Sequence, residues 1–541
     1  MEMWQTKADL TELLCELVRV PSITLTDAEK AVPGLVAEKL GTLAYFQAHR
    51  EHLQLHPTGD GREFVTALVK KAPDVRETVV LLSHFDVVSV QDYGEWKDMA
   101  FDAKELTRFF NEHQEVLPPE VQDDLKSGEW LFGRGTMDMK AGLALQMAMV
   151  EQACAGKFAG NVLLLTVPDE EVDSIGMRAA VPAMLKLAEE HGLEYQAVLN
   201  SEPMFALPPG DTKKYLYTGT IGKVLPGLYC YGKESHVGEP FRGLNANLMA
   251  SLATLEVELN ADFCERVEGE VTPPPTNLLQ KDLRKDYSVQ IPSRAVTLFN
   301  LFLFERSIDD VMQQLLTAAN RAARKIEQHY AERIQHSRQL GSAESGAVSV
   351  RVLSYEQLHA YAVQTHGQEV LEQRQAKLAA GRGGMDDRNF SVELVDDLAG
   401  LCKELAPMIV VFFTPSFYPA VSSRRHCLVQ DVVADVIKRA EDTYGIELEQ
   451  VHFFPGICDL SYVGLPVPPD AMRPMTANMP LWEKGYQLPL DEMKRLDVPV
   501  LNIGPVGKDA HKWTERLELS YSFGTLRELL PLAIEKLLAG K

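Results

Sequence analysis

Four short apolar runs in this chain each lead into side chains that can bind a divalent metal ion. The runs are TVVLLSHFD, NVLLLTVPDEE, YQAVLNSEP and VPVLNIGPVGKDAH. Apolar runs of this length, alternating with helical stretches, are typical of buried strands in a mostly parallel sheet. In such sheets, ligands bind outside the carboxyl ends of the strands. The pattern therefore predicts an α/β fold in which acids and imidazoles from distant segments meet at one edge of the sheet.

A change of pattern divides the chain into two domains. From 215 to 236 the sequence takes up long alternating strands, and the helix and strand patterns that follow have a β-α-β-α order typical of an α+β domain. We therefore expect a discontinuous catalytic domain, residues 1–216 and 427–541, with a mostly parallel or mixed sheet flanked by helices. Residues 217–426 would form an inserted domain, with an extra helical insertion near 355–405.

Composition narrows the classes of partner. The chain has 77 acidic and 54 basic residues and a net charge of −23, which disfavours binding to nucleic acid or to an anionic membrane. Its seven cysteines are scattered without a CxxC pair, which is typical of reduced thiols in a cytosolic protein. No signal-peptide pattern is evident, and no apolar run approaches the roughly 20 residues that span a bilayer. We expect a cytoplasmic protein that acts on a small molecule.

Five residues near the predicted strand ends could together hold two divalent cations. They are His84, Asp138, Glu171, Glu202 and His511. Two cations about 3.5 Å apart that share a carboxylate acidify water and polarise a carbonyl oxygen. A general base must then accept the proton of the water and pass it to the leaving nitrogen. Adjacent side chains of an extended segment point in opposite directions, so one member of the Glu170–Glu171 pair can bind metal while the other meets the water.

Each of these segments also has an ordinary structural explanation. A single His-x-Asp such as His84 with Asp86 is usually a core or surface histidine, and Asp138 could simply cap a helix. The Glu170–Glu171 pair could be a solvated loop, and Glu202 before proline could belong to a turn. Their order along the chain and their positions at strand ends favour the metal site over these separate explanations.

Two other motifs are rejected. The segment GLYCYGKE, residues 227–234, nearly matches a phosphate-binding loop, but Glu234 stands where a serine or threonine must hold magnesium. Cys458 in FFPGICDLS is interpreted as a small buried thiol rather than a nucleophile.

The motifs together resemble a known family. The segments HFD (84–86), GRGTMDMKAG (133–142), DEE (169–171) and SEP (201–203), followed by the late His511, resemble the co-catalytic zinc aminoacylase and glutamate carboxypeptidase family. The likeness covers nearly the whole chain and is weaker from 340 to 425. The chain is similar to a longer branch of the family that takes part in arginine utilization.

The resemblance implies a role for each candidate residue. One metal would be bound by His84 and Glu202, the other by Glu171 and His511, and Asp138 would bridge them. Glu170 would be the general base, and Asp86 would hold the second nitrogen of His84 and so fix its orientation. A cis peptide bond is expected between Asp138 and Met139. Zinc is the expected metal, and manganese or cobalt would also suit the ligand set.

The resemblance also implies that the inserted domain, residues 217–426, is a lid or dimerisation domain through which the chain forms a homodimer. His236 in GKESHVGEP would donate to the developing oxyanion, in its own site or in that of a partner subunit. The alternative is an ordinary surface histidine. FFPGICDLSYVG resembles a loop near the site and makes Asp459 a further candidate. Exopeptidase members carry Asp-x-Arg where this chain has Asn300 and Phe302, with Arg306 further along, so that route to a substrate carboxylate is not expected.

The sequence therefore predicts a two-metal hydrolase. It would cleave an amide-type C–N bond, peptidyl, N-acyl or N-carbamoyl, in a small amino-acid derivative, and the resemblance points to arginine catabolism. Two alternatives remain: a non-catalytic relative that binds a metal or an amino acid and has a regulatory role, and a metal-dependent esterase.

Overall fold

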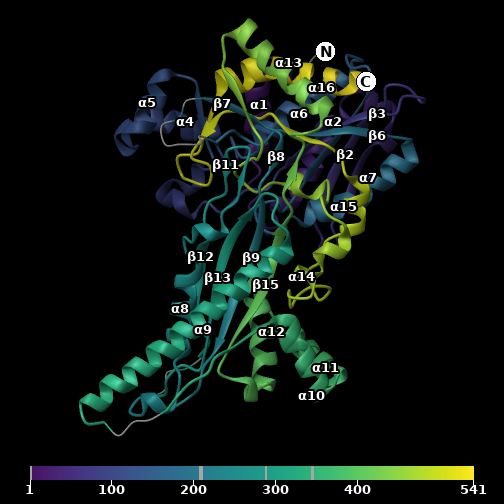
Figure 1. Ribbon diagram of the computed structural model, residues 1–541. Coiled ribbons are helices and arrows are strands. Elements are labelled where there is room, and N and C mark those ends of the chain that lie inside the picture. The colour runs from purple at the N-terminus through teal and green to yellow at the C-terminus, as the bar shows by residue number, and fades with distance from the viewer. Residues whose placement is uncertain are drawn as a thin grey trace. The chain divides into compact units, whose positions relative to one another are not determined.

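The chain folds into two compact units (Figure 1). The computed structural model describes residues 3–205, 211, 213–284, 286, 289–342 and 346–540. The first unit comprises Met1–Ile221, Val421–Pro466 and Pro489–Lys541, and the second comprises Gly222–Ala420 and Val467–Leu488. The α/β class with a second α+β unit inserted into the first is the fold that the sequence predicts.

One segment is placed differently from our expectation. Residues 467–488, which we assigned to the first domain, pack with the second unit. The backbone carbonyl of Asn478 accepts the N–H of Phe413 at 2.8 Å, and its side-chain oxygen accepts the N–H of Glu356 at 2.9 Å. The elements of residues 467–488 are short and proline-rich and have no apolar periodicity. The sequence of this segment therefore does not indicate which unit it packs with.

The first unit is built on an eight-stranded mixed sheet in the order β1-β2-β5-β3-β6-β18-β7-β17. Its strands are β1 (Leu53–Pro57), β2 (Glu63–Val69), β3 (Glu77–His84), β5 (Asn161–Val167), β6 (Glu194–Asn200), β7 (Lys214–Tyr217), β17 (Leu448–Val451) and β18 (Val500–Asn502). The neighbouring strands β5, β3, β6 and β18 run parallel to one another. Their carboxyl ends therefore lie at the same edge of the sheet.

Helices cover both faces of this sheet, which explains the uninterrupted apolar runs. Alternate strand residues such as Val79 and Leu81 belong to one core cluster with residues of several helices. Among these helices are α1 (Lys7–Val18), α6 (Lys140–Cys154), α13 (Cys427–Tyr444) and α16 (Leu526–Ala539). The intervening residues Val80 and Leu82 are also buried and point to the opposite face, where α7 (Ile175–His191) packs on β2 and β5.

Smaller elements complete the first unit. Its other helices are α2 (Val32–Gly41), α3 (Ala44–Ala48), α4 (Ala103–Glu112), α5 (Pro119–Ser127) and α15 (Leu490–Leu496). Its short strands are β4 (Trp130–Phe132), β8 (Gly219–Thr220), β16 (Val421–Ser422), β19 (Gly507–Lys508) and β20 (Arg516–Glu518). The pairing β19-β20-β4 joins the segment that carries α4 and α5 to the loop that contains His511.

The second unit has a five-stranded sheet in the order β12-β13-β9-β15-β14. The strands are β9 (Gly222–Tyr231), β12 (Thr276–Asp282), β13 (Arg294–Leu303), β14 (Arg351–Ser354) and β15 (Met408–Tyr418), beside a small hairpin of β10 (Arg266–Val267) and β11 (Glu270–Val271). All neighbouring pairs of the five are antiparallel except β14 and β15.

Two sets of helices pack on this second sheet. The helices α8 (Ala246–Val257) and α9 (Ile308–Gln339) pack on each other and on one face. On the other face, a separate core cluster joins Tyr229, Val410 and Phe412 to α10 (Tyr355–His366) and α12 (Asp387–Leu401), which flank α11 (Gln368–Ala380). The short α14 (Arg473–Thr476) contacts α9. The helical stretch expected near 355–405 thus forms an additional layer of three helices.

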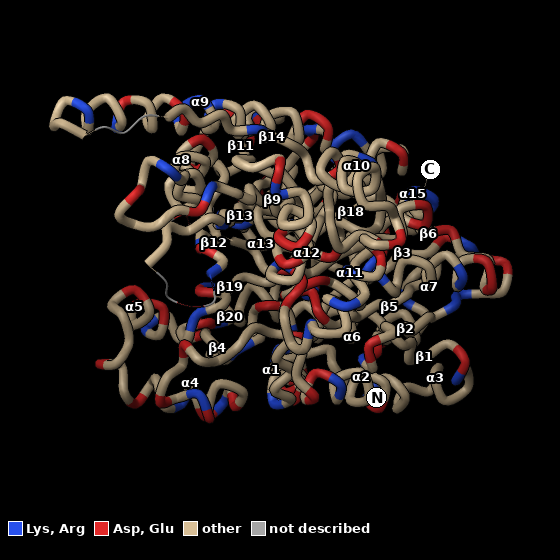
Figure 2. Tube along the Cα trace, turned by 90° about the horizontal axis from the view of Figure 1, so that it is seen from below, with Lys and Arg blue, Asp and Glu red and all other residues tan. Residues whose placement is uncertain are grey.

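Charged residues are distributed over the helices and loops, and the acidic and basic positions are interspersed along the chain trace in Figure 2. Within the described part of the chain, no helix is long and apolar enough to cross a membrane.

Candidate metal centre

The five predicted metal ligands all lie in the first unit, at the carboxyl edge of the parallel strands. His84 is the last residue of β3, and Glu202 follows the end of β6 by two residues. Glu171 lies in the loop after β5, which is the neighbour of β3 on the side opposite β6. Asp138 comes just before α6, and His511 lies in the loop between β19 and β20. The sheet order thus brings together residues that are far apart in the sequence.

Asp138 lies between two histidines. Its Oδ1 is 3.4 Å from Nε2 of His84, and its Oδ2 is 3.2 Å from Nε2 of His511. Each oxygen of one carboxylate therefore faces a different imidazole. A carboxylate that bridges two cations has this arrangement.

A second carboxylate accompanies each histidine. Oε1 of Glu202 is 3.5 Å from Nε2 of His84, and Oε1 of Glu171 is 3.1 Å from Nε2 of His511. Two atoms bound tetrahedrally to one zinc ion at about 2.0–2.1 Å are about 3.3 Å apart. The observed separations therefore fit two ligand groups that share Asp138.

Two further observations test whether a metal fits this cluster. Nε2 of His84 is buried, and no described residue forms a hydrogen bond with it. One ligand atom each from His84, Asp138 and Glu171 lie within 4.8 Å of one another. A buried imidazole nitrogen aimed at carboxylate oxygens is suited to a divalent cation of the zinc, manganese or cobalt type.

The charges of the cluster also favour cations. Burial raises the pKa of Glu170 and Glu202 well above their ordinary value, and the neighbouring carboxylates raise it further. Burial opposes the charged form of His511, but its hydrogen bonds with Asp138 and Glu171 outweigh this effect and raise its pKa to about 11. Without metal, these groups therefore retain protons that divalent cations would displace.

Asp86 connects the histidine to the two adjacent glutamates. Its carboxylate accepts the backbone N–H of Glu170 at 3.1 Å and of Glu171 at 3.3 Å, and the hydroxyl of Thr24 at 2.7 Å. Nδ1 of His84 is 3.4 Å from Oδ1 of Asp86 but only 3.1 Å from its backbone carbonyl oxygen. Our expectation named the carboxylate as the partner of His84, and the structure adds the carbonyl as the closer acceptor.

Glu170 lies beside the ligand group. Its Oε2 is 3.9 Å from Nε2 of His84, and its side chain is buried. The peptide bond between Asp138 and Met139 is cis, as the resemblance implied.

The comparison with protein families agrees with this geometry. Residues 80–478 match the model of peptidase family M20/M25/M40. The chain belongs to this family. It is therefore a metal-dependent hydrolase of the amidohydrolase and peptidase kind, and we refer to the family below as the M20 family.

Two relatives from Bacillus subtilis (strain 168) are similar over almost the entire chain. Protein YqjN is 49% identical over 99% of this chain and 97% of its own length. Protein RocB is 30% identical over 97% of this chain and 93% of its own length. Among solved structures, the M20 family metallo-carboxypeptidase Sso-CP2 from Sulfolobus solfataricus has a TM-score of 0.56 with 13% identity, covering 98% of this chain and 99% of its own. At that identity, the likeness shows the fold alone.

Glu515 is a residue of this M20 chain that sequence reasoning missed. Its buried Oε1 accepts the backbone N–H of Gly135 at 2.8 Å, of Met137 at 3.3 Å and of Asp138 at 3.4 Å. Its Oε2 accepts a hydrogen bond from Arg134 at 2.7 Å. One carboxylate thus holds the loop that carries Asp138. The only sign in the sequence is an acid four residues after His511, in a polar segment where acids are common.

Two glycines allow close backbone approach beside Glu202. A Cβ atom at Gly504 would overlap the carbonyl oxygen of Glu202, and one at Gly142 would overlap that of Ser201. Gly142 lies in α6, and Gly504 follows β18. The predicted ligand Glu202 is therefore held between a helix and a strand end that only glycine lets approach so closely.

The two remaining candidates differ in position. Asp459 begins the short helix η8 (Asp459–Tyr462) of the first unit and is buried, and burial raises its pKa to about 7. Its charge also raises the pKa of Glu170 and Glu202, after burial itself. His236 belongs to the second unit, where it is exposed and its Nδ1 accepts the N–H of Gly238 at 3.1 Å. Its oxyanion role stays a prediction.

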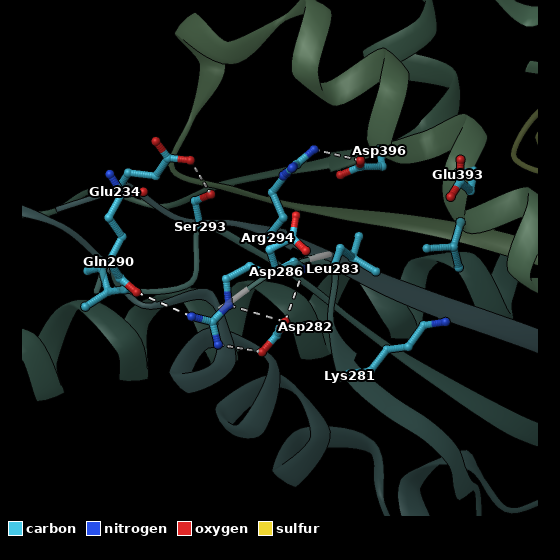
Figure 3. Close-up of a pocket in the computed structure, with 13 residues that line it drawn as sticks. Glu234, Lys281, Asp282, Leu283, Asp286, Gln290, Ser293, Arg294, Glu393 and Asp396 are labelled. Carbon is cyan, nitrogen blue, oxygen red and sulfur yellow. Dashed lines mark hydrogen bonds and ion pairs between the residues drawn. The ribbon is translucent and has the colours of Figure 1, made fainter. Parts of the chain in front are cut away.

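The second unit also contains a cavity of about 720 Å³ (Figure 3). Both arginines in its wall are engaged: Arg284 pairs with Asp282 at 3.0 Å, and Arg294 pairs with Asp396 at 2.8 Å. Its wall has five carboxylates (Glu234, Asp282, Asp286, Glu393 and Asp396) and three basic groups (Lys281, Arg284 and Arg294). This excess of acid favours cationic over anionic ligands.

Proposed function

We propose that this chain uses two divalent metal ions to hydrolyse an amide-type C–N bond, peptidyl, N-acyl or N-carbamoyl, in a small amino-acid derivative. The observation that carries the proposal is the carboxylate of Asp138, whose two oxygens face His84 and His511 separately. We assign His84 and Glu202 to one metal and Glu171 and His511 to the other. Zinc is the proposed metal, with manganese or cobalt as substitutes.

Glu170 is the proposed general base. When bound, the metals would acidify the attacking water and polarise the scissile carbonyl. Glu170 accepts a proton from the water as the new C–O bond forms, and it delivers that proton to the leaving nitrogen as the C–N bond breaks. Asp86 supports both functions, because it holds the backbone of Glu170 and the imidazole of His84.

The proposed substrates are derivatives of arginine, citrulline or ornithine. RocB represents the longer branch of the family that the sequence resemblance connects with arginine utilization. The similarity of this chain to RocB therefore supports a role in arginine catabolism. At the positions where exopeptidases carry Asp-x-Arg, this chain has Asn300 and Phe302. We therefore propose that a free α-carboxylate is recognised by other residues.

A product analysis tests the proposal. The purified chain is incubated with N-acyl, N-carbamoyl and dipeptide derivatives of basic amino acids, and with matched esters, with and without added zinc or manganese. We expect metal-dependent release of a free amine from at least one amide. Turnover of esters alone would make it an esterase, and bound metal without turnover of any substrate would favour a regulatory relative.

The variant E170Q tests the role of the base. We expect it to retain two metal ions per chain and to lose at least about a hundredfold in kcat, which is the usual contribution of a general base. Full activity in this variant would overturn the assignment. Loss of metal would instead indicate that Glu170 is a ligand.

We further propose a homodimer formed through the second unit. β12 is an edge strand of the five-stranded sheet, and its residues are mostly exposed. Leu278 on this strand and Leu255 on the adjacent α8 are 58% and 72% exposed. An edge strand flanked by exposed leucines favours pairing with a second copy. A cytoplasmic location is part of the proposal, and the seven free cysteines support it.

A further inference from the structure

A second group of potential metal ligands lies in the layer of three helices of the second unit. His366 is the last residue of α10, Cys402 follows the end of α12, and Glu404 lies in the short helix η7 (Lys403–Leu405). A ring nitrogen of His366, the sulfur of Cys402 and a carboxylate oxygen of Glu404 lie within 4.8 Å of one another. The packing of α10 on α12 brings these distant residues together.

The surroundings of the three side chains point to a ligand. Nε2 of His366 is buried, and the described part of the chain offers it no hydrogen-bond partner. Buried polar atoms in native proteins normally have such a partner. Cys402 is completely buried, so its sulfur is shielded on the side of the protein core.

Glu404 provides the open side of the group. Its carboxylate is oriented by the hydroxyl of Tyr361, which donates to Oε1 at 2.9 Å, and the residue is exposed. A hydrogen bond that orients a ligand is a common feature of metal sites. The exposed side gives an ion a path of entry and leaves room for a water molecule as a fourth ligand.

We propose that His366, Cys402 and Glu404 bind one divalent metal ion of the zinc type, separate from the two-metal centre. A thiolate, an imidazole and a carboxylate form a ligand set that zinc accepts. Binding replaces the thiol proton of Cys402 by the metal and releases that proton to solvent, with no change of oxidation state. Small rotations of the side chains would bring the ligand atoms to the roughly 3–4 Å separations of a zinc site.

The ion would connect two parts of the second unit. It joins the end of α10 to the link between α12 and β15, and therefore attaches the helical layer to the sheet. Because this layer packs on the sheet through its own core cluster, the site adds a local crosslink to an existing interface. The proposal does not depend on the proposed hydrolysis, because its ligands belong to a different unit.

A second group of three potential ligands, in the first unit, lacks the features that favour a metal ion at His366, Cys402 and Glu404. His49, Glu51 and His52 also lie within 4.8 Å of one another in the first unit. There, however, His49 and Glu51 are exposed, and Nδ1 of His52 is engaged by the hydroxyl of Tyr45 at 2.8 Å. That group shows no buried nitrogen that lacks a partner among the described residues, and we assign no ion to it.

Cobalt substitution of the full chain tests the site. Cobalt bound to a thiolate gives a charge-transfer band in the near ultraviolet, and the ligands proposed for the two-metal centre include no sulfur. We expect the band in the wild type and in the control C427S, which removes an exposed thiol, and its loss in C402S and H366A. We also expect C402S to hold two zinc ions per chain instead of three, with hydrolytic activity within twofold of the wild type.

Two results of the cobalt experiment would overturn the site: a wild-type chain without the band, or a C402S variant that retains it. If C402S fails to fold, alkylation of the wild type decides. In urea just below the unfolding transition, zinc should slow modification of Cys402 at least tenfold and a chelator should reverse this, while Cys427 reacts equally in both conditions. Equal reaction of Cys402 with and without zinc would reject the proposal.

Discussion

At the scale of single residues, the site depends on carboxylates that touch no metal in the proposed arrangement. Asp86 organises His84, Glu170 and Glu171 through hydrogen bonds, and Glu515 organises the loop of Asp138. Both are completely buried. A buried carboxylate is stable only where donors surround it, and here those donors belong to functional segments.

Replacing Asp86 tests the first of these residues. In D86N the amide keeps the shape of the side chain, but its oxygen accepts hydrogen bonds more weakly and the NH₂ group cannot accept from His84. We expect kcat and zinc affinity each to fall by about 10–100-fold, which is typical for a group that orients a metal ligand. Steady-state kinetics and zinc titration measure both. T24V, which removes only a hydroxyl partner of Asp86, should have a smaller effect.

Replacing Glu515 tests whether this buried carboxylate organises the loop of Asp138. E515Q removes the negative charge of the buried partner of Arg134, whose second carboxylate partner Asp92, at 3.0 Å, is exposed. It also weakens three backbone hydrogen bonds. We expect the free energy of unfolding to fall by roughly 3–5 kcal/mol, as for other broken buried pairs, together with weaker zinc binding. Denaturant unfolding and zinc titration provide the measurements. The nearby and less buried Glu518 supplies the control E518Q, and unchanged zinc affinity in E515Q would contradict the positioning role.

At the scale of elements, the site results from parallel strands that end together. His84, Glu171 and Glu202 follow three neighbouring strands, β3, β5 and β6. This placement requires that β18 and α6 approach the end of β6 closely, which Gly504 and Gly142 allow. The geometry of Glu202 is therefore determined by the packing of two other elements.

The variant G504A tests this packing. The added methyl group would overlap the carbonyl oxygen of Glu202 and force the strand ends apart. We expect a loss of roughly 1–3 kcal/mol in the free energy of unfolding, as for other overpacked sites, and reduced zinc content. G34A is the matched control, because Gly34 lies in α2 with open space around its Cβ position. A variant G504A with normal stability and zinc content would contradict this account.

At the scale of the whole molecule, bound metal should contribute to stability. Within the cluster, the carboxylates of Asp138, Glu171 and Glu202 face the imidazoles of His84 and His511. Burial raises the pKa of Glu171 and Glu202, so removal of metal leaves these acids partly protonated. We expect chelation to abolish hydrolysis and to lower Tm, and zinc or manganese to restore both. An ion present at 100 times its Kd adds about 2.7 kcal/mol of stability. Differential scanning calorimetry measures the shift, and an unchanged Tm with full activity after chelation would exclude a metal requirement.

The proposed homodimer provides a second prediction for the whole molecule. L278K places a charge on the exposed edge strand β12 and should prevent pairing with a second copy. We expect the mass in analytical ultracentrifugation to fall from that of a dimer to that of a monomer. L25K changes an exposed leucine of the first unit and serves as the control. A wild-type chain that sediments as a monomer would reject the dimer itself.

The sequence by itself was sufficient for the α/β class, the inserted α+β unit and the placement of candidate ligands at strand ends. These features are local, because strands buried on both faces are continuous apolar runs, and the residues that follow them stand out. Roles within the ligand set came from the family resemblance rather than from periodicity.

Only the tertiary structure decided which segments distant in the sequence contact one another. It assigned 467–488 to the second unit, made the carbonyl of Asp86 an acceptor for His84, and brought Glu515 to the loop of Asp138. It also brought Cys402 to His366. Each of these contacts joins segments through a single side chain or a short irregular stretch. Such contacts leave no period in the sequence, because they are produced by the packing of elements that are distant along the chain.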